Sequence, residues 1–103
     1  MSQMDQIFEA LAHPIRRELL DILKKEGELA AGDLSARFDL AKPSLSHHFK
    51  TLLHAGLIDR ERRGRQIFYR IQMSVLEEAA QLAFRLFDVQ VKNAKPGSEG
   101  ELS

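Results

Sequence analysis

Residues 42–54 have the sequence KPSLSHHFKTLLH and are followed directly by AGLI. At about 100° per residue in an α-helix, four apolar side chains of this stretch share one face: Leu45, Phe49, Leu52 and Leu53. The opposite face carries hydroxyls, imidazoles and lysine but no carboxylate. Because a solvated helix face usually mixes charges of both signs, a face of donors without acids favours a polyanionic partner. The stretch therefore predicts a recognition helix over residues 43–55 that enters the major groove of DNA.

The net charge of zero conceals a basic block around this helix. Residues 42–70 contain seven Lys or Arg and two Asp or Glu, whereas the flanks 1–41 and 71–103 each contain more acids than bases. Charge runs are often no more than salt-bridged surface. This block coincides with the acid-free helix face, and the combination favours nucleic-acid binding on one side of the domain.

The length and composition of the chain exclude several classes of protein. A chain of 103 residues with 44% hydrophobic and 29% charged residues is typical of one small globular domain. It has no apolar run near the roughly 20 residues that cross a membrane, and its first residues lack the pattern of a signal peptide. We therefore expect a cytoplasmic protein without membrane insertion.

The sequence also lacks the residue patterns of an enzyme or a metal site. It contains no cysteine, so it has neither disulfides nor thiolate ligands. Its four histidines include no i, i+4 pair and have no carboxylate at ligand spacing, and no nucleophile stands beside a base. We predict no catalytic activity, no cofactor and no metal site.

Three helices are expected before the recognition helix. Apolar residues at helical spacing predict the first over residues 3–12, and Pro14 begins a second that ends at Gly27. A short third helix over residues 32–39 precedes the turn 40–42. A short helix, a turn of about three or four residues and a second helix form a helix-turn-helix pattern.

A β-hairpin is expected after the recognition helix. Residues 57–62 and 66–71 have strand character, and the second run places apolar side chains at period two. The glycine between the two runs suits a hairpin turn. The resulting wing over residues 62–66 carries three arginines, Arg62, Arg63 and Arg65. A protruding cationic tip favours contact with phosphates or with the minor groove.

The last helix is expected over residues 75–92, with Ser74 as its N-cap. Its apolar sector is wider than the roughly 100° stripe of an ordinary surface helix. One face can cover the core of the monomer, and the other needs a partner, which predicts a homodimer with the first helix beside it. The expected interface residues are Met4, Ile7, Phe8, Leu11, Val75, Ala79, Leu82, Leu86 and Val89. Residues 1–92 thus form the DNA-binding and dimerisation domain, and the polar residues 93–103 form a disordered tail.

The order of elements and three segments resemble the ArsR family of bacterial winged helix-turn-helix repressors. The segments are FEALAHPIRRELLDIL, LSARFDLAKPSLSHHFKTLLHAGLI and RERRGRQIFYRI. The KPS and SHH of the recognition helix, with no metal-binding cysteines, are similar to the SdpR-like autorepressors within that family. The resemblance implies a mainly α, homodimeric winged helix-turn-helix with a small β-hairpin, in the order α-α-α-α-β-β-α.

The resemblance also implies a function. The chain would be a dimeric repressor, and in this subgroup an autorepressor, that binds an imperfect palindrome in double-stranded DNA. Ser44, Ser46 and His47 would face base edges or nearby phosphates, and the wing would reach the minor groove through Arg63 and Arg65. The expected DNA-binding residues are Lys42, Ser44, Ser46, His47, His48, Lys50, Thr51, Arg62, Arg63 and Arg65. Metal sensing is not carried over, because residues 28–34 hold no cysteine pair and the last helix holds no histidine.

Several alternatives stay open at this point. A winged-helix protein-interaction module would use the same elements without DNA. A repressor could be released by a small molecule, by a metal bound without thiolates or by a partner protein. His48 lies at the edge of the apolar face, so packing and DNA contact are both compatible with its position. Phe84 and Phe87 are interpreted as core residues in preference to the lining of an effector pocket.

The remaining basic residues are interpreted mainly as structural. His13 is expected to cap the second helix rather than to bind a ligand. Arg16 and Arg17 are expected to pair with acids close to them in the sequence. Arg60 and Arg70 are ambiguous between phosphate contact and surface pairing.

Overall fold

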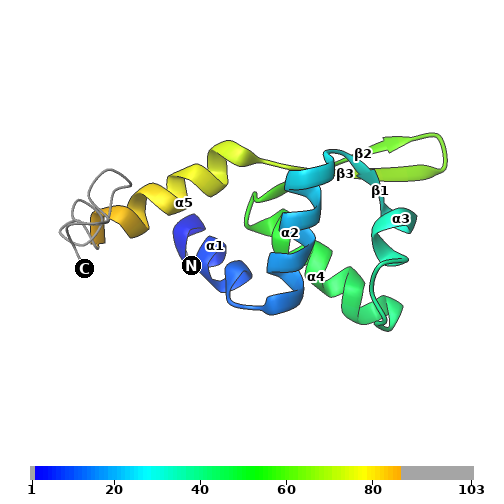
Figure 1. The fold of residues 1–103 in the computed structure, drawn as a ribbon, viewed down its shortest axis with the longest axis horizontal. Helices are drawn as coiled ribbons and strands as arrows, with labels where there is room; N and C mark the ends of the chain where they lie inside the picture. The colour runs from blue at the N-terminus through cyan, green and yellow to red at the C-terminus, as the bar shows by residue number, and fades with distance from the viewer. Residues whose placement is uncertain (1, 87–103) are drawn as a thin grey trace, which may run out of the picture.

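The computed structural model describes residues 2–86 as five helices and three short strands (Figure 1). Their bounds are α1 Gln3–Leu11, α2 Pro14–Glu26, β1 Leu29–Ala30, α3 Ala31–Ser35, α4 Lys42–His54, β2 Ile58–Arg63, β3 Gln66–Ile71 and α5 Met73–Leu86. This architecture confirms the predicted fold class, with α3 and α4 forming the helix-turn-helix. In Figure 1, α1 and α5 lie at one end of the molecule and the hairpin β2–β3 at the other. Among the helices of residues 2–86, none is both long and apolar enough to cross a membrane.

The recognition helix α4 begins and ends for reasons visible in its sequence. Pro43 lies in its first turn, where a missing N–H leaves no bond unmade. The N-cap residue, Ala41, makes no side-chain hydrogen bond to the helix, as a residue without a hydroxyl or carboxylate must. At the other end Gly56 has φ +79°, and the Leu57 N–H donates to the Leu52 carbonyl at 3.0 Å. This is the Schellman ending that favours glycine.

The three strands form one antiparallel sheet in the order β1-β3-β2. The turn between β2 and β3 consists of Gly64 and Arg65, and only the glycine has a positive φ, +64°, which is the pattern of a type II′ turn. Strand β1 adds Leu29 and Ala30 beside β3. The hairpin was predicted, but β1 was not, because two residues are too few to show a period. The predicted order therefore gains one strand between α2 and α3.

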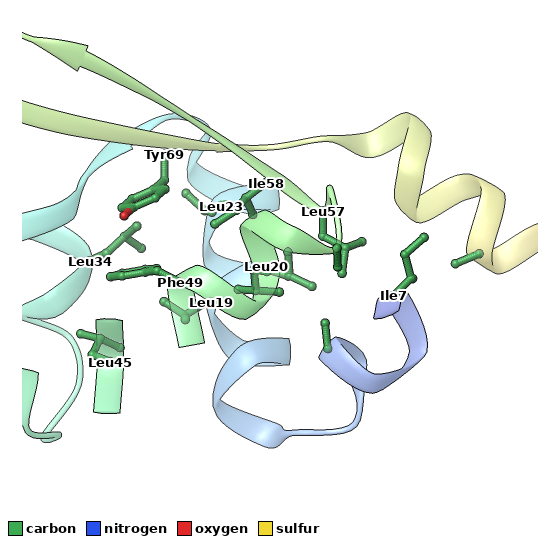
Figure 2. Packing of buried hydrophobic residues seen from close by; sticks show 14 residues of the cluster. Ile7, Leu19, Leu20, Leu23, Leu34, Leu45, Phe49, Leu57, Ile58 and Tyr69 are labelled. Carbon is green, nitrogen blue, oxygen red and sulfur yellow. The ribbon is translucent and has the colours of Figure 1, made fainter. Parts of the chain in front are cut away.

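The hydrophobic core joins all the helices to the sheet (Figure 2). Its fully buried large side chains are Ile7, Leu19, Leu23, Leu34, Leu52, Leu57 and Ile58. Phe49 of α4 stacks on Tyr69 of β3, with ring centroids 4.5 Å apart and planes 16° from parallel. Figure 2 shows this pair beside Leu34 of α3. The stack fixes the recognition helix against the hairpin.

Two helix bounds within the described residues differ from the sequence prediction by more than one residue. Helix α5 begins at Met73, because the N–H groups of Val75 and Leu76 donate to the Gln72 carbonyl at 3.2 and 3.3 Å. Ser74 is therefore inside the first turn instead of capping it. Helix α3 ends at Ser35, and the chain continues through turns to α4. The predicted end of the last helix, residues 87–92, and the tail 93–103 lie outside the described residues.

Candidate nucleic-acid interface

The outward side of α4 carries most of the side chains that the sequence predicted for DNA contact. Those exposed to solvent are Lys42, Ser44, Ser46, His47 and Lys50, and we call them the α4 row. Thr51 is half-buried, and its hydroxyl donates to the His47 carbonyl at 3.0 Å. The α4 row therefore presents hydroxyl, imidazole and ammonium groups without a carboxylate, which is the chemistry that base edges and phosphates accept.

His48 is buried and does not belong to the α4 row, which corrects its assignment as a DNA contact. Only 8% of it is exposed, and its Nδ1 lies 3.2 Å from Nη1 of Arg16. Successive side chains of a helix differ in direction by about 100°. His47 therefore lies on the outer face of α4, whereas His48 points into the core. Burial lowers the pKa of His48, and the nearby His13, Arg16 and His47 lower it further.

The hairpin has two faces with different electrostatics. Residues paired across two strands place their side chains on the same face, and β2 pairs Arg60 with Tyr69 and Arg62 with Ile67. We call this the open face, because neither arginine forms an ion pair with any carboxylate in residues 2–86. Alternate residues of β2 and β3 lie on the other side, which we call the paired face: Asp59, Glu61, Arg63, Phe68 and Arg70.

Carboxylates neutralise the arginines of the paired face. Arg63 contacts Glu28, which precedes β1, at 2.6 Å and Glu61 at 2.8 Å, and its guanidinium carbon lies 4.6 Å from the Phe68 ring centroid. Arg70 contacts Glu61 at 3.3 Å and Glu28 at 3.5 Å. Hydrogen bonds to Glu61 and Glu28 raise the pKa of Arg63, and the bond from Arg63 lowers the pKa of Glu61. Arg63 is thus not the free cation that the wing sequence predicted.

The open face forms one wall of a cleft between α4 and the hairpin. The cleft has a volume of about 390 Å³ and is lined by Ser46, Phe49, Lys50, Leu53, His54, Arg60 and Tyr69. Its lining residues carry two cations, an imidazole and two hydroxyls but no carboxylate. Sequence reasoning left Arg60 ambiguous. The period-two alternation that places it on the same face as buried Ile58 was the signal that could have found it.

The tip of the hairpin keeps the other two predicted arginines in solvent. Arg62 and Arg65 are both exposed. The Nε of Arg62 donates to the Gly64 carbonyl at 3.2 Å, which orients the side chain along the turn. The tip and the open face together carry three arginines that form no ion pair in residues 2–86.

The arginines at the start of α2 do not pair with acids, contrary to the sequence prediction. Arg16 is buried and donates from Nε to the Ala10 carbonyl at 2.7 Å. Arg17 donates to the Leu11 carbonyl at 2.8 Å. Both satisfy carbonyls at the end of α1, which have no partner within that helix. His13 caps α2 as predicted, because its Nδ1 accepts the Ile15 N–H at 3.1 Å.

The predicted dimer residues divide into buried and exposed sets. Ile7 and Ala79 are 1% and 2% exposed and belong to the core of the monomer, so their assignment to the interface is corrected. Phe8 and Leu86 are 39% and 71% exposed. Phe84, which was expected in the core, is 56% exposed. Phe8 belongs to α1, and Phe84 and Leu86 belong to α5. These two helices contact each other and lie at the end of the molecule away from the hairpin (Figure 1).

In the part of the chain that the structure describes, no three His, Asp or Glu side chains come close enough together to hold a metal ion. The candidate site consists of the α4 row, the cleft and the hairpin tip.

Comparison with known proteins identifies relatives of the whole winged helix. A family model described as a helix-turn-helix domain matches residues 11–61. The chain is 40% identical to the transcriptional repressor SdpR of Bacillus subtilis over 74% of this chain and 83% of that one. It is 36% identical to the biofilm growth-associated repressor of Agrobacterium fabrum, over 81% of this chain and 68% of that one. Among solved structures, an ArsR family transcriptional regulator superposes with a TM-score of 0.79 at 28% identity, covering 86% of this chain and 97% of that one.

Proposed function

The chain belongs to the ArsR family of winged helix-turn-helix transcriptional repressors, and we propose that it works as a homodimer that binds an imperfect palindrome in double-stranded DNA. It is a DNA-binding transcriptional repressor, as its relatives are. Those relatives are transcriptional regulators, and none of the matches indicates an enzyme family. We place it in the cytoplasm, with the DNA that it binds.

The observation that carries the DNA interface is the continuity between the α4 row and the α4–hairpin cleft. Ser46 and Lys50 belong to both, so one surface without carboxylates runs from the exposed side of α4 to Arg60 of β2. Base edges in the major groove would be contacted by Ser44, Ser46 and His47. A backbone phosphate beside that groove would be held in the cleft between Lys50 and Arg60.

Further phosphate contacts are assigned by charge and exposure. Lys42 lies in the first turn of α4, where the N–H groups also favour an anion. Arg62 and Arg65 at the hairpin tip supply cations for the flanking backbone or the minor groove. Arg63 is left out of this set because Glu28 and Glu61 already neutralise it.

The homodimer is proposed from the apolar end of the molecule. Phe8, Phe84 and Leu86 are exposed on two helices that touch each other. Large exposed apolar side chains on adjoining helices favour an interaction site. Other residues of the predicted interface are partly buried, namely Met4, Leu11, Val75 and Leu82, while Val89 lies outside the described residues. The two recognition helices of such a dimer would lie about 34–36 Å apart in successive major grooves.

Selection of bound sites from random duplex DNA tests the DNA proposal. We expect enrichment of two related half-sites whose centres are about 10 base pairs apart. Affinity for the enriched duplex should fall with salt by about 0.9 in log–log slope for each phosphate contact. No enrichment, or an affinity insensitive to salt, would instead support a protein-interaction module. Footprinting upstream of the gene for this protein would then test autorepression.

A charged substitution tests the dimer. Leu86→Glu places a carboxylate in the proposed interface, whereas Gln81→Glu adds the same charge at an exposed polar position of the same helix. Analytical ultracentrifugation should show monomers for the first variant and dimers for the second. A dimer that persists in Leu86→Glu would remove this face from the interface. Titration of candidate small molecules, metal ions or partner proteins into the dimer–DNA complex would identify an effector.

A further inference from the structure

Two buried polar side chains meet where α1, α2 and α4 come together. Arg16 of α2 is 9% exposed and His48 of the recognition helix is 8% exposed, and they are the buried polar residues of the described chain. Burying a guanidinium is costly unless its donors are satisfied. The bonds that Arg16 makes therefore indicate what this junction holds in place.

The three nitrogens of Arg16 contact three acceptors on two other helices. Nε donates to the Ala10 carbonyl at 2.7 Å and Nη2 to the Glu9 carbonyl at 3.1 Å, both at the end of α1. Nη1 lies 3.2 Å from Nδ1 of His48. A guanidinium has no acceptor, so Nη1 donates and Nδ1 must carry a lone pair. The His48 ring in this contact is neutral, with its proton on Nε2.

This contact connects the apolar end of the molecule to the DNA-facing helix. Helix α1 carries Phe8 of the proposed dimer surface, and α4 carries the α4 row. His48 directly follows His47, which belongs to that row, so the bond to Arg16 holds α4 next to a proposed base contact. A shift of about 1 Å in such a helix is enough to misplace its base contacts.

The charged and titratable groups around His48 oppose a positive charge on its ring. The loop before α2 contributes His13, with ring centroids 4.4 Å apart, and α4 contributes His47 at 6.0 Å. Helix α2 contributes Arg16 itself. Helix α1 contributes Glu9, which forms no ion pair within residues 2–86. Glu9 lines a pocket with Gln6, Thr51 and His54, and His48 is not part of that pocket. Within residues 2–86, no carboxylate forms an ion pair with this cluster.

We propose that Arg16 and His48 position the recognition helix through a contact that exists only while the His48 ring is neutral, so that mild acid releases α4 and weakens DNA binding. Protonation at Nδ1 removes the acceptor and places two cations 3.2 Å apart. Burial and the neighbouring cations already lower the pKa of His48, so the neutral ring is the form at neutral pH. The proposal rests on the proposed DNA-binding function.

The direction in which DNA affinity changes with pH distinguishes the Arg16–His48 contact from the attraction of exposed histidines to phosphates. His47 and His54 are exposed, and protonating them adds positive charge to the DNA-facing surface. Positive charge added on that surface strengthens binding to a polyanion. Protonating buried His48 does the opposite. A net loss of affinity in mild acid therefore cannot come from the exposed histidines.

His48→Asn is the decisive variant, with His47→Asn as its matched control. The Asn oxygen lies at the position of Nδ1 and can accept from Arg16, but the amide does not titrate. The probe is a fluorescein-labelled duplex carrying the site selected by the wild-type protein, with anisotropy measured from pH 8 to pH 5 at fixed ionic strength. Each affinity is compared with that of the same variant at pH 8, because His47→Asn removes a proposed base contact and should bind more weakly throughout. Relative to pH 8, wild type and His47→Asn should both lose affinity by up to about tenfold per pH unit, the limit for one linked proton. His48→Asn should bind at pH 8 and show no acid loss; an acid loss equal to that of wild type would overturn the proposal.

Nitrogen-15 NMR of the histidine rings tests the contact without DNA. In the wild-type protein at pH 8 the His48 Nδ1 should have the chemical shift of an unprotonated nitrogen, and acid should change it. In Arg16→Met the donor is gone, and the His48 ring should populate both tautomers. A His48 tautomer unaffected by Arg16→Met would overturn the contact. If Arg16→Met does not fold, the tautomer and titration of His48 in the wild-type protein still test the contact. If NMR shows the contact but no DNA site is selected, only the proposed DNA-binding function has failed.

Discussion

The two faces of the hairpin carry arginines in similar number but present different charge to their surroundings. On the paired face, Arg63 and Arg70 are neutralised by Glu28 and Glu61. On the open face, Arg60 and Arg62 form no ion pair in the described chain and one of them lines the cleft beside α4. The positive charge available to a nucleic acid is therefore set by strand alternation and not by the number of arginines.

The same comparison shows how one short segment serves two purposes. The paired face ties the hairpin to Glu28, which precedes β1, so it stiffens the sheet. The open face leaves its cations for a partner, and its Tyr69 stacks on Phe49 of α4. Four experiments test this division.

The largest expected effect comes from removing the stack that relates the open face to α4. Phe49→Ala should destabilise the domain by about 3–5 kcal/mol, the usual cost of truncating a buried phenylalanine. Chemical denaturation measures the loss, and Phe49→Leu, which keeps an apolar side chain, should lose less. Wild-type stability in Phe49→Ala would show that the stack does not hold the hairpin against the recognition helix.

The next prediction compares the two arginines of the open face with the two arginines of the paired face. Arg60→Ala with Arg62→Ala should weaken binding to every duplex, because each charge-assisted contact contributes about 1.5–3 kcal/mol, and should flatten the salt dependence by about 0.9 per lost phosphate contact. The matched double variant of the other face is Arg63→Ala with Arg70→Ala. Its salt slope should stay close to that of the wild-type protein. Equal slopes in the two double variants would end the distinction between the faces.

Much of this surface could be predicted from the sequence, because its signals are local and periodic. The recognition helix follows from the apolar spacing of Leu45, Phe49 and Leu52 and from a row without acids. The hairpin follows from period-two alternation around Gly64. The period also gives the two faces, once it is applied to charged residues as well as to apolar ones.

The remaining features depend on contacts between residues far apart in the chain. Glu28 and Arg63 are 35 positions apart, and Arg16 and His48 are 32 positions apart. No local pattern indicates that an arginine in one segment is satisfied by a group in another. The sequence therefore overestimates the free charge of the wing, and it leaves open whether His48 packs against the core or contacts DNA.

A smaller effect should follow when the paired face is released from its carboxylates. Glu28→Gln with Glu61→Gln keeps the shapes of the side chains but removes the charges that hold Arg63. Affinity for duplex DNA of random sequence should rise, with a salt slope steeper by up to about 0.9 for each arginine that reaches a phosphate. An unchanged slope would mean that the paired face is directed away from the DNA as well as neutralised. Either result sharpens the division, because the first assigns a screening role to the carboxylates.

The smallest effect concerns the acid stability of the paired face. Hydrogen bonds from Arg63 and then Arg70 lower the pKa of Glu61, so the folded state binds its proton less readily than the unfolded chain does. The stabilisation is complete above the unfolded pKa of about 4.3 and is lost as the pH falls through the lower folded value. Glu61→Gln should thus lower the thermal unfolding temperature slightly at pH 7, and less in strong acid. The pKa of His48 is also lowered in the folded state. The stabilisation from its contact with Arg16 is therefore lost over a higher pH range, which begins as the pH falls below the unfolded histidine value of about 6.5. The unfolding temperatures of Glu61→Gln and His48→Asn, measured across both pH ranges, should show the effect of Glu61 at the lower pH and that of His48 at the higher pH. If both effects occurred in one pH range, the assignment of the lower range to the hairpin would be contradicted.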